Sequence, residues 1–570
     1  MTALVLGPLL RFIDATRATV WVETDAACRV EVLGAVEPTF AIEGHHYALV
    51  QVEGLEPGGA HPYEVHLDGE RVWPEPDSDF PPSTIRPPRA GEPFALVFGS
   101  CRVTGPHETL PTSTRGFARQ SSDVDALRTL GLRLRGLPPD ALPDALLLLG
   151  DQVYADDVSP DTESFIATRG RRDGAPEDEV ADFEEYTQLY REAWSEPVVR
   201  WLLSTLPTSM IFDDHDVHDD WNTSAAWVEE MRRKPWWQAR IEGAMMSYWV
   251  YQHLGNLAPE DLADDTQYPA IRGRDGSEPL RAFARRADRE SKGARWSYVR
   301  DFGRVRLLVL DSRSGRVLDG PTHRKMLDDA EFAWAREHAG ADVDHLLVAT
   351  TLPYLLPPAL HNLEAWNEAV AAGRWGRRAA RVGERMRQGA DLEHWAAFED
   401  SFRRLTELIR EVAAGRLGRA PASLVVLSGD VHHAYLSRVQ DPSGLESAVY
   451  QAVCSPMRHP MPRLMQWVYR VAVAPPSARL ARWLARRAGV APPPVTWQVD
   501  EGPWFDNQIA TLSLHGRRAD LRLERARLGA DGAPRLDTLL DRPLTDQSAD
   551  RSRAAAADGE PAASPPRTAG

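Results

Sequence analysis

Five aspartates and two histidines lie within twelve residues, in the segment IFDDHDVHDDWN at positions 211–222. Carboxylates this close together disfavour one another's charged form unless a positive partner is present. The segment follows an apolar run at 201–206 and begins with Ile211 and Phe212, which places it at the edge of a core. A bound cation is therefore the simpler explanation for the cluster, and an acidic surface turn is the alternative.

Further candidate ligands follow short apolar runs that are typical of buried strands. They are Cys101 after FALVFGS, Asp151 and Tyr154 after ALLLLG, and Asp430 and His432 after SLVVLSG. Ligands of α/β sheets bind at the carboxyl ends of the strands. If the last segment is extended, side chains 430 and 432 point to the same side, which suits a chelating pair. The alternative for Cys101 is a buried inert thiol. The alternative for the aspartates is that they cap turns, and the alternative for Tyr154 and His432 is that their rings belong to the core.

A positive residue, Arg313, follows another predicted strand at 305–310. Its guanidinium group could hold a phosphate group through two parallel hydrogen bonds, or it could pair with Asp311. Arg102, next to Cys101, is a second candidate for holding phosphate oxygens. The sequence leaves these alternatives open.

The elements that must position these residues divide into two units and a tail. Residues 1–90 contain strands separated by turns at even spacing, which predicts a β-sandwich, and the step from GLEPGG into YEVHLDG resembles a fibronectin type III module. A proline-rich linker leads to a mixed α/β unit at 94–540. Residues 541–570 are rich in Ala, Pro, Asp and Ser and are predicted to be disordered.

Helices are predicted where apolar residues recur at helical spacing. The spacing indicates helices over 182–206, with a break at Pro197, and over 225–254. The polar segment 159–180 is predicted to be a loop.

The segment 462–488 predicts a basic amphipathic helix pair, broken at Pro475 and Pro476. We expect it to pack on its own domain, and contact with a membrane surface is the alternative.

The composition limits the class of partner. The chain has 570 residues and a net charge of −17, which argues against nucleic acid as a partner and requires metals or arginines wherever an anionic substrate binds. The three cysteines lie too far apart to suggest a disulfide framework. The N-terminal segment has neither the pattern of a signal peptide nor that of a membrane span, so a cytoplasmic location is expected. The oligomeric state is left open.

The ordered set GSC, GDQVY, DDHD with DDWN, LDSR and GDVHH resembles the PhoD-like branch of the calcineurin-like metallophosphatases. The resemblance covers roughly residues 1–540. It implies a double β-sheet sandwich flanked by helices, with a metal cluster at the strand ends. Two features depart from the family pattern: Asp219 and Asp220 stand where a pair of asparagines is common, and the twin-arginine leader of exported members is missing.

The resemblance also implies roles for individual residues. The metal ligands would be Cys101, Asp151, Tyr154, Asp214, Asp430 and His432. Asp151 would bridge two ions, and the anionic donors of Cys101 and Tyr154 would suit Fe³⁺. The second ion would be Ca²⁺, which the extra charge of Asp219 and Asp220 favours, with Mn²⁺ or Zn²⁺ as alternatives. His215 would face the leaving group.

The expected function is a metal-dependent phosphoesterase, in which a metal-activated hydroxide attacks a phosphomonoester or a phosphodiester. His215 would protonate the departing oxygen, and Arg313 would hold phosphate oxygens. The alternative is a metal-stabilised binding protein with a non-catalytic site.

Overall fold

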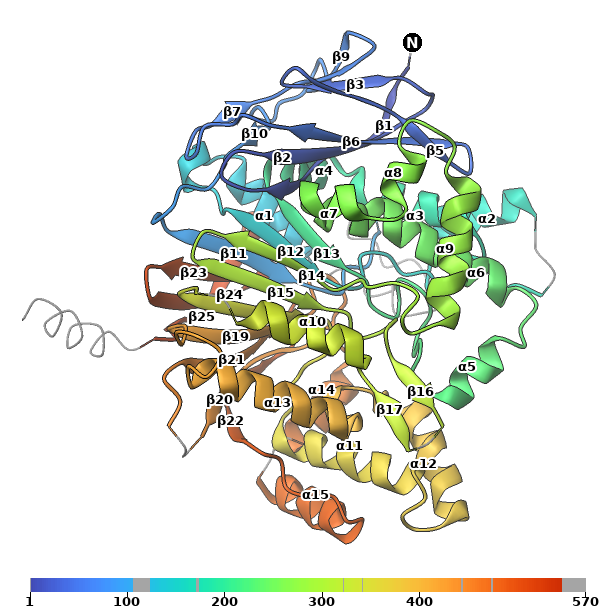
Figure 1. Ribbon diagram of the computed structural model, residues 1–570, viewed down its shortest axis with the longest axis vertical. Helices are drawn as coiled ribbons and strands as arrows, with labels where there is room; N and C mark the ends of the chain where they lie inside the picture. Colours follow the sequence, from blue (N-terminus) through green and yellow to red (C-terminus); the bar gives the residue numbers. More distant parts are fainter. Residues whose placement is uncertain are drawn as a thin grey trace, which may run out of the picture.

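The computed structural model describes residues 2–105, 124–170, 174–320, 322–340, 342–441, 444–472 and 475–545. The chain forms an N-terminal β-sandwich, which lies at the top of Figure 1, and two larger sheets below it, with helices around them. This is the mixed α/β arrangement that the sequence predicted.

Two antiparallel four-stranded sheets make up the N-terminal sandwich. The first has the order β1 (Leu4–Ile13), β2 (Ala18–Thr24), β6 (His45–Val52), β5 (Phe40–Ile42). The second has the order β4 (Ala35–Pro38), β3 (Arg29–Val32), β8 (Val65–Leu67), β9 (Glu70–Trp73). A short ribbon of β7 (His61–Pro62) and β10 (Thr84–Ile85) leads out of this unit.

Two mixed sheets form the centre of the molecule. The six-stranded sheet has the order β13 (Thr208–Ile211), β12 (Ala145–Leu149), β11 (Phe94–Gly99), β23 (Gln508–His515), β24 (Arg518–Leu528), β25 (Pro534–Pro543). The seven-stranded sheet has the order β14 (Tyr298–Phe302), β15 (Val305–Leu310), β18 (His345–Thr350), β19 (Ser423–Ser428), β21 (Ala448–Val453), β20 (Ala434–Gln440), β22 (Thr496–Trp504).

Strand direction explains where polar loops gather. Strands β11, β12 and β13 are parallel neighbours, and so are β15, β18, β19 and β21 in the other sheet. Their apolar residues are buried on both faces, as parallel strands require. Strand β11 also pairs antiparallel with β23, which comes from near the far end of the chain.

Helices cover the outer faces of these sheets (Figure 1). Those before β14 are α1 (Ala126–Leu134), α2 (Pro160–Arg169), α3 (Phe183–Trp194), α4 (Pro197–Thr205), α5 (Ala225–Met231), α6 (Trp237–Ser247), α7 (Pro259–Asp264), α8 (Tyr268–Ile271) and α9 (Ser277–Arg289). Those after it are α10 (Asp329–Ala339), α11 (Pro358–Ala371), α12 (Arg377–Gly389), α13 (Glu399–Ala413), α14 (Arg463–Ala472) and α15 (Pro475–Arg487). Short helical turns η2 (Pro139–Ala141), η3 (Tyr248–His253), η4 (Leu254–Asn256) and η5 (Trp395–Ala397) and the ribbon of β16 (Val317–Asp319) with β17 (His323–Lys325) complete the elements.

Two boundary predictions were wrong. The segment predicted as a loop at 159–180 contains α2, because Ser159 caps its first turn, Pro160 fits the first helical position and Asp161 and Glu163 favour the positive helix end. Strand β25 extends to Pro543, past the expected start of the disordered tail at 541. The rest of that predicted tail, 546–570, lies outside the described residues.

The break predicted at Pro197 is confirmed, since α3 ends at Trp194 and α4 begins at that proline. In the part of the chain that the structure describes, no helix combines the length and the apolar character needed to cross a bilayer.

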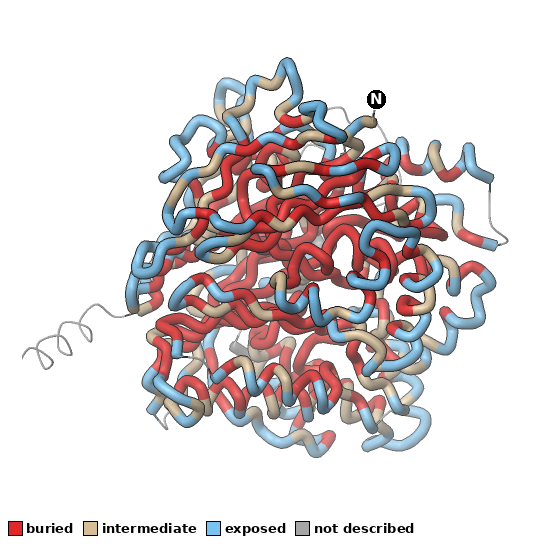
Figure 2. The backbone as a smooth tube through the Cα atoms, turned by 45° about the horizontal axis from the view of Figure 1, so that its top comes forward, coloured by how far each residue is buried: buried red, intermediate tan, exposed pale blue. Residues whose placement is uncertain are grey.

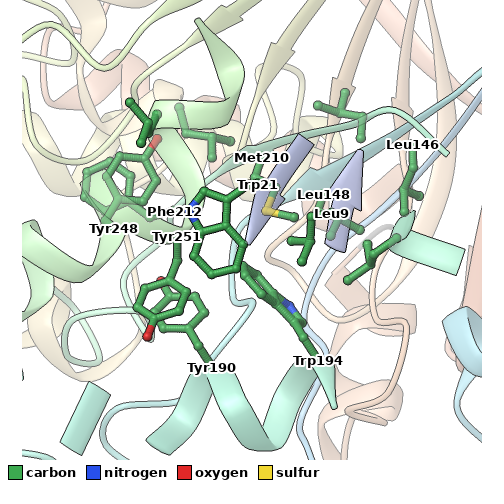
Figure 3. Close-up of a cluster of buried hydrophobic side chains, with 14 of the residues drawn as sticks. Leu9, Trp21, Leu146, Leu148, Tyr190, Trp194, Met210, Phe212, Tyr248 and Tyr251 are labelled. Carbon is green, nitrogen blue, oxygen red and sulfur yellow. The ribbon is translucent and has the colours of Figure 1, made fainter. Parts of the chain in front are cut away.

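The N-terminal sandwich and the central sheets share one hydrophobic core. Trp21 of β2 lies against Tyr251, with ring centres 5.3 Å apart, and Tyr251 stacks on Tyr190 of α3 at 4.2 Å. Figure 3 shows these rings beside Leu148 of β12 and Met210 of β13. Figure 2 shows buried chain continuing from the sandwich into the central sheets.

The buried Arg11 makes several hydrogen bonds between the sandwich and the central unit. The Arg11 side chain donates hydrogen bonds to the carbonyl oxygens of Thr208 (3.0 Å), Tyr251 (2.7 Å) and Gln252 (2.7 Å) and to the Asn256 side chain (3.1 Å). Its guanidinium group therefore provides hydrogen-bond donors for backbone carbonyl groups near the end of η3 and at the start of β13. Strand β13 leads into the acidic segment.

We expect Arg11→Met to lower the free energy of unfolding by about 3–5 kcal/mol, because it leaves several buried acceptors without a donor. Denaturant unfolding would measure the loss. Arg17→Met is the matched control, since Arg17 pairs near the surface with Asp14 and Glu260. Equal losses in the two variants would contradict the role given to Arg11.

One histidine in the helical layer is buried without a charge partner. His361 of α11 packs against the rings of Phe402 (4.6 Å) and Trp497 (4.7 Å). Its Nδ1 atom finds no hydrogen-bond partner among the described residues. Burial lowers the pKa of His361 to about 3.

We expect His361→Phe to reduce the loss of stability that acid causes. The unfolded chain protonates this histidine below about pH 6.5, whereas the folded chain does so only near pH 3. The folded state therefore loses free energy relative to the unfolded state as the pH falls through this window, by roughly 1.4 kcal/mol at about pH 5.5. Unfolding curves at neutral and mildly acidic pH would show that the free energy of unfolding falls less steeply with falling pH in the variant. An unchanged dependence on pH would contradict the low pKa of His361.

Candidate metal centre

The carboxyl ends of four parallel strands, from both central sheets, meet at one place. Cys101 lies just after β11, Asp151 after β12, and Asp430 after β19. Asp213 and Asp214 follow β13 in the same way. Each polar residue thus continues an apolar strand that is anchored in the core, which fixes the position of its side chain.

The strand ends turn sharply as they leave the sheets. Cys101, Asp151, Asp430 and His432 have positive φ angles of 55°, 52°, 65° and 51°. This left-handed conformation is unfavourable for residues other than glycine and marks sites where the surroundings impose the backbone.

Two glycines permit the close approach. A Cβ atom on Gly150 would lie 2.5 Å from the Cβ of Asp213. A Cβ atom on Gly429 would lie 2.0 Å from Oγ of Ser100, whose hydroxyl accepts a hydrogen bond from the Asp430 amide at 3.1 Å. The two sheets therefore touch at Gly429.

The donor atoms form two groups that share one residue. One group consists of Cys101, Asp151 and His432, and the other of Asp151, Asp213, Asp214 and Asp430. Within each group the ligand atoms lie within 4.8 Å of one another. An arrangement of this kind can hold two cations with Asp151 between them.

Tyr154 and His215 lie beside these groups. The Tyr154 hydroxyl is 3.5 Å from Oδ2 of Asp151, and its ring centre is 4.7 Å from that of His215. His215 is held through Nδ1 by both carboxylate oxygens of Asp156, at 2.9 and 3.0 Å. The structure thus brings all six predicted ligands and His215 to one site.

The site is too negative to stay ionised by itself. Burial, and then the nearby carboxylates of Asp214 and Asp430, raise the pKa of Asp151 well above its usual value, against the opposing effect of His215. Burial and the same kind of repulsion raise the pKa of the Cys101 thiol. Only cations at the site would keep both groups deprotonated.

Arg313 supplies the one fully buried guanidinium group that contacts these carboxylates within the described residues. It forms ion pairs with Asp213 and Glu393, with Asp214 at 3.1 Å and with Asp430 at 3.3 Å. The Asp311 side chain accepts hydrogen bonds from the backbone amides of Arg313 (2.9 Å), Ser314 (3.0 Å) and Gly315 (2.9 Å), and not from the Arg313 guanidinium group. The Arg313 guanidinium group therefore does not pair with Asp311, which was one alternative that the sequence left open. It forms ion pairs with the carboxylates of the site.

Arg102 lies elsewhere. Its guanidinium group pairs with Asp125 at 2.9 Å and donates to the Ala193 carbonyl, so it is occupied within the fold.

Residues that the sequence analysis missed surround the centre. His394 pairs with Glu364 at 2.6 Å and lies 3.4 Å from Asp430. His459 lies 3.3 Å from the His432 ring and 3.4 Å from the Tyr154 hydroxyl. His459 follows the end of β21, so the strand-end pattern could have found it, whereas His394 lies in a loop without such a signal.

The argument that placed Asp430 and His432 on one face of an extended segment was wrong. Both residues adopt left-handed backbone angles after β19 ends, so the alternation of an extended chain does not apply to them. They consequently fall into different ligand groups. Burial lowers the pKa of His432 to about 4, which keeps its ring neutral and able to bind a cation.

The aspartates of the acidic segment 211–222 have different roles. Asp213 and Asp214 face the centre, whereas Asp216 accepts hydrogen bonds from the backbone amides of Asp151 (2.8 Å) and Asp213 (2.9 Å) and so fixes both strand ends. Asp220 donates its amide to Asp214 at 3.1 Å, and the Asp219 side chain is exposed.

A cavity of about 420 Å³ opens onto the centre. Asp214, His215, Asp430 and His432 lie at its polar end. The rest of its wall combines the apolar side chains of Leu356, Leu360, Leu363, Met461, Met465 and Tyr469 with the polar side chains of Asp219, Glu364, Asp391, Glu393 and His394. A ligand with one anionic and one apolar part fits this arrangement.

Family models match two parts of the chain. Residues 138–463 match the family model "PhoD-like phosphatase", and residues 1–85 match "Domain of unknown function (DUF7800)". No curated protein matches the chain.

Among solved structures, "Structure of PhoD" is similar over 95% of this chain and 92% of its own, with 13% identity and a TM-score of 0.56. A purple acid phosphatase, PPD1, from yellow lupin (Lupinus luteus) seeds aligns over 92% of this chain and 72% of its own, with 11% identity and a TM-score of 0.47. The first of these likenesses shows a shared fold.

We expect Arg313→Met to lower the free energy of unfolding of the metal-free protein by about 3–5 kcal/mol, because it leaves buried carboxylates without their positive partner. Arg306→Met, on the strand β15 that precedes Arg313, should cost less than about 1 kcal/mol, since that arginine pairs with the exposed Asp301. Denaturant unfolding of both variants is the measurement. Similar small losses would show that Arg313 does not balance the site.

Proposed function

This chain belongs to the PhoD-like phosphatase family and is a metal-dependent hydrolase of phosphate esters, and from that premise we propose that Asp151 joins two metal ions at the strand ends. The observation that carries the proposal is the presence of Asp151 in both ligand groups. Cys101 and His432, with Tyr154 beside them, would hold one ion. Asp213, Asp214 and Asp430 would hold the other.

The residues fit such ions. Oδ1 of Asp151 and Oδ2 of Asp213 are buried and have no hydrogen-bond partner within the described part of the chain. Leaving buried carboxylate oxygens without partners is costly, and a bound cation removes the cost. This supports the use of both oxygens as metal ligands.

The donor atoms suggest which ions bind. A thiolate, a phenolate and an imidazole together suit a transition metal, and we propose Fe³⁺ for the group around Cys101. The group around Asp213 offers only carboxylate oxygens, which suit a hard cation, and we propose Ca²⁺ there. Mn²⁺ and Zn²⁺ are the alternatives that elemental analysis would distinguish.

The chain's own residues would orient the reaction. Metal ions bound here would lower the pKa of a coordinated water and neutralise the phosphate group. Asp156 fixes the His215 ring through Nδ1, which leaves Nε2 directed away from that carboxylate and available to the leaving oxygen. Arg313 is enclosed by carboxylates, so we now propose that it positions Asp213 and Asp214, in place of the expected contact with phosphate.

The cavity supports a substrate class. Its polar end would take the phosphate group, and its apolar wall would take an apolar alcohol. We propose a phosphate ester with an apolar substituent, and the size of the cavity accommodates a monoester or a diester. The alternative of a non-catalytic metal site loses its support, because the chain belongs to a family of phosphatases.

We expect Asp151→Asn to lose bound metal and to lower kcat by at least about a thousandfold, because one residue serves both ions. Asp264→Asn, on the exposed end of α7, is the matched control with the same change of charge. Elemental analysis and hydrolysis of a chromogenic phosphomonoester and phosphodiester would be measured before and after chelation. Full metal content in Asp151→Asn would refute the bridging role.

A further inference from the structure

One end of the molecule exposes tryptophans. Among the described residues, Trp375, Trp467 and Trp483 are the exposed tryptophans, at 44%, 63% and 51%. Trp467 lies on α14, Trp483 on α15, and Trp375 just before α12. The Trp375 indole donates to the Arg487 carbonyl at 3.4 Å, so the start of α12 and the end of α15 are neighbours.

Arginines surround these rings. On α15, Arg479, Arg482, Arg486 and Arg487 are exposed, and Arg487 lies 5.1 Å from the centre of the Trp483 ring. We call the exposed faces of α12, α14 and α15, together with Trp375, the basic aromatic surface.

Helix α12 adds more positive charge. Arg377, Arg378, Arg381 and Arg385 are exposed on it, beside the exposed Val382. Glu384 is the one acidic residue between 373 and 389, and the segment 462–488 contains none. A chain with a net charge of −17 therefore concentrates positive charge at one place.

The helices have the amphipathic pattern of surface-binding helices. In α15 the small residues Ala481 and Ala485 are buried, while Leu480 and Trp483 point outward. Exposed apolar residues on a helix that already has a buried face are not needed for packing in this chain. Figure 1 shows α12 and α15 together at the end of the molecule opposite the N-terminal sandwich.

The surface adjoins the mouth of the cavity. Met465 and Tyr469 of α14 line the cavity, and Met465 is also exposed, on the same helix as Trp467. A partner bound to the basic aromatic surface would therefore lie beside the opening of the metal centre.

We propose that the basic aromatic surface binds an anionic lipid bilayer. Arginines attract the negative headgroups, and tryptophan, leucine and methionine side chains insert at the boundary between headgroups and acyl chains. The aliphatic Leu480 and Val382 favour lipid over nucleic acid, because they offer neither charge nor a stacking face to an RNA or DNA strand. The inference concerns binding and stands independently of the hydrolysis proposed above.

Vesicle co-sedimentation of the full chain tests the proposal. We expect binding to vesicles of phosphatidylcholine mixed with an equal amount of phosphatidylglycerol, little binding to phosphatidylcholine alone, and release at high salt. The variant Arg479→Ala/Arg482→Ala and the variant Trp467→Ala/Trp483→Ala should each weaken binding on the order of tenfold.

The matched control is Arg232→Ala/Arg233→Ala, which removes the same charge from exposed positions around α5 and should leave binding unchanged. The circular dichroism spectrum and the thermal unfolding temperature should be unchanged in all these variants, which shows that they are folded and separates this test from that of the catalytic proposal. Failure of the full chain to bind anionic vesicles, equal binding by all variants, or binding to a short RNA in place of vesicles would each overturn the proposal.

Discussion

The placement of negative charge inside the protein is the constraint on which the rest of the structure depends. Asp151, Asp213 and Asp214 are buried, and Asp430 is half-buried, with their ligand atoms within 4.8 Å of one another. Such a group is unfavourable in an apolar interior unless cations balance it. The protein supplies Arg313 for part of this balance, and the negative charge that remains is the reason for the metal ions proposed here.

That requirement shapes the two central sheets. The proposed ligands come from the ends of β11, β12, β13 and β19, so the sheets must approach until Gly429 touches Ser100. The hydroxyl of Ser100 then holds the amide of Asp430, and the carboxylate of Asp216 holds the amides of Asp151 and Asp213. Backbone hydrogen bonds thus position the ligands before any cation binds, which is the preorganisation that catalytic sites require.

The sequence predicted the parts of the site that follow apolar strands. A run such as ALLLLG determines both a buried strand and the place where it ends, so Asp151 could be located without a structure. Asp156 and His394 could not, because their positions depend on how loops fold across the site. The error over Asp430 and His432 has a related cause, since tertiary contacts impose backbone angles that local sequence does not reveal. The polar composition of residues 159–180 indicated a loop, so the α2 helix was missed. Its capping residues favour the helix more strongly than that composition opposes it.

The pairing of β11 with β23 has a consequence for the making of the protein. Strand β11 carries Cys101 to the centre, yet its antiparallel neighbour begins only at Gln508. On a ribosome, the edge of β11 therefore waits, for roughly tens of seconds at ordinary rates of elongation, until the roughly 400 residues between Gly99 and Gln508 have emerged. An unpaired strand edge invites association with other nascent chains, so a chaperone that shields this edge until β23 pairs with it would raise the yield.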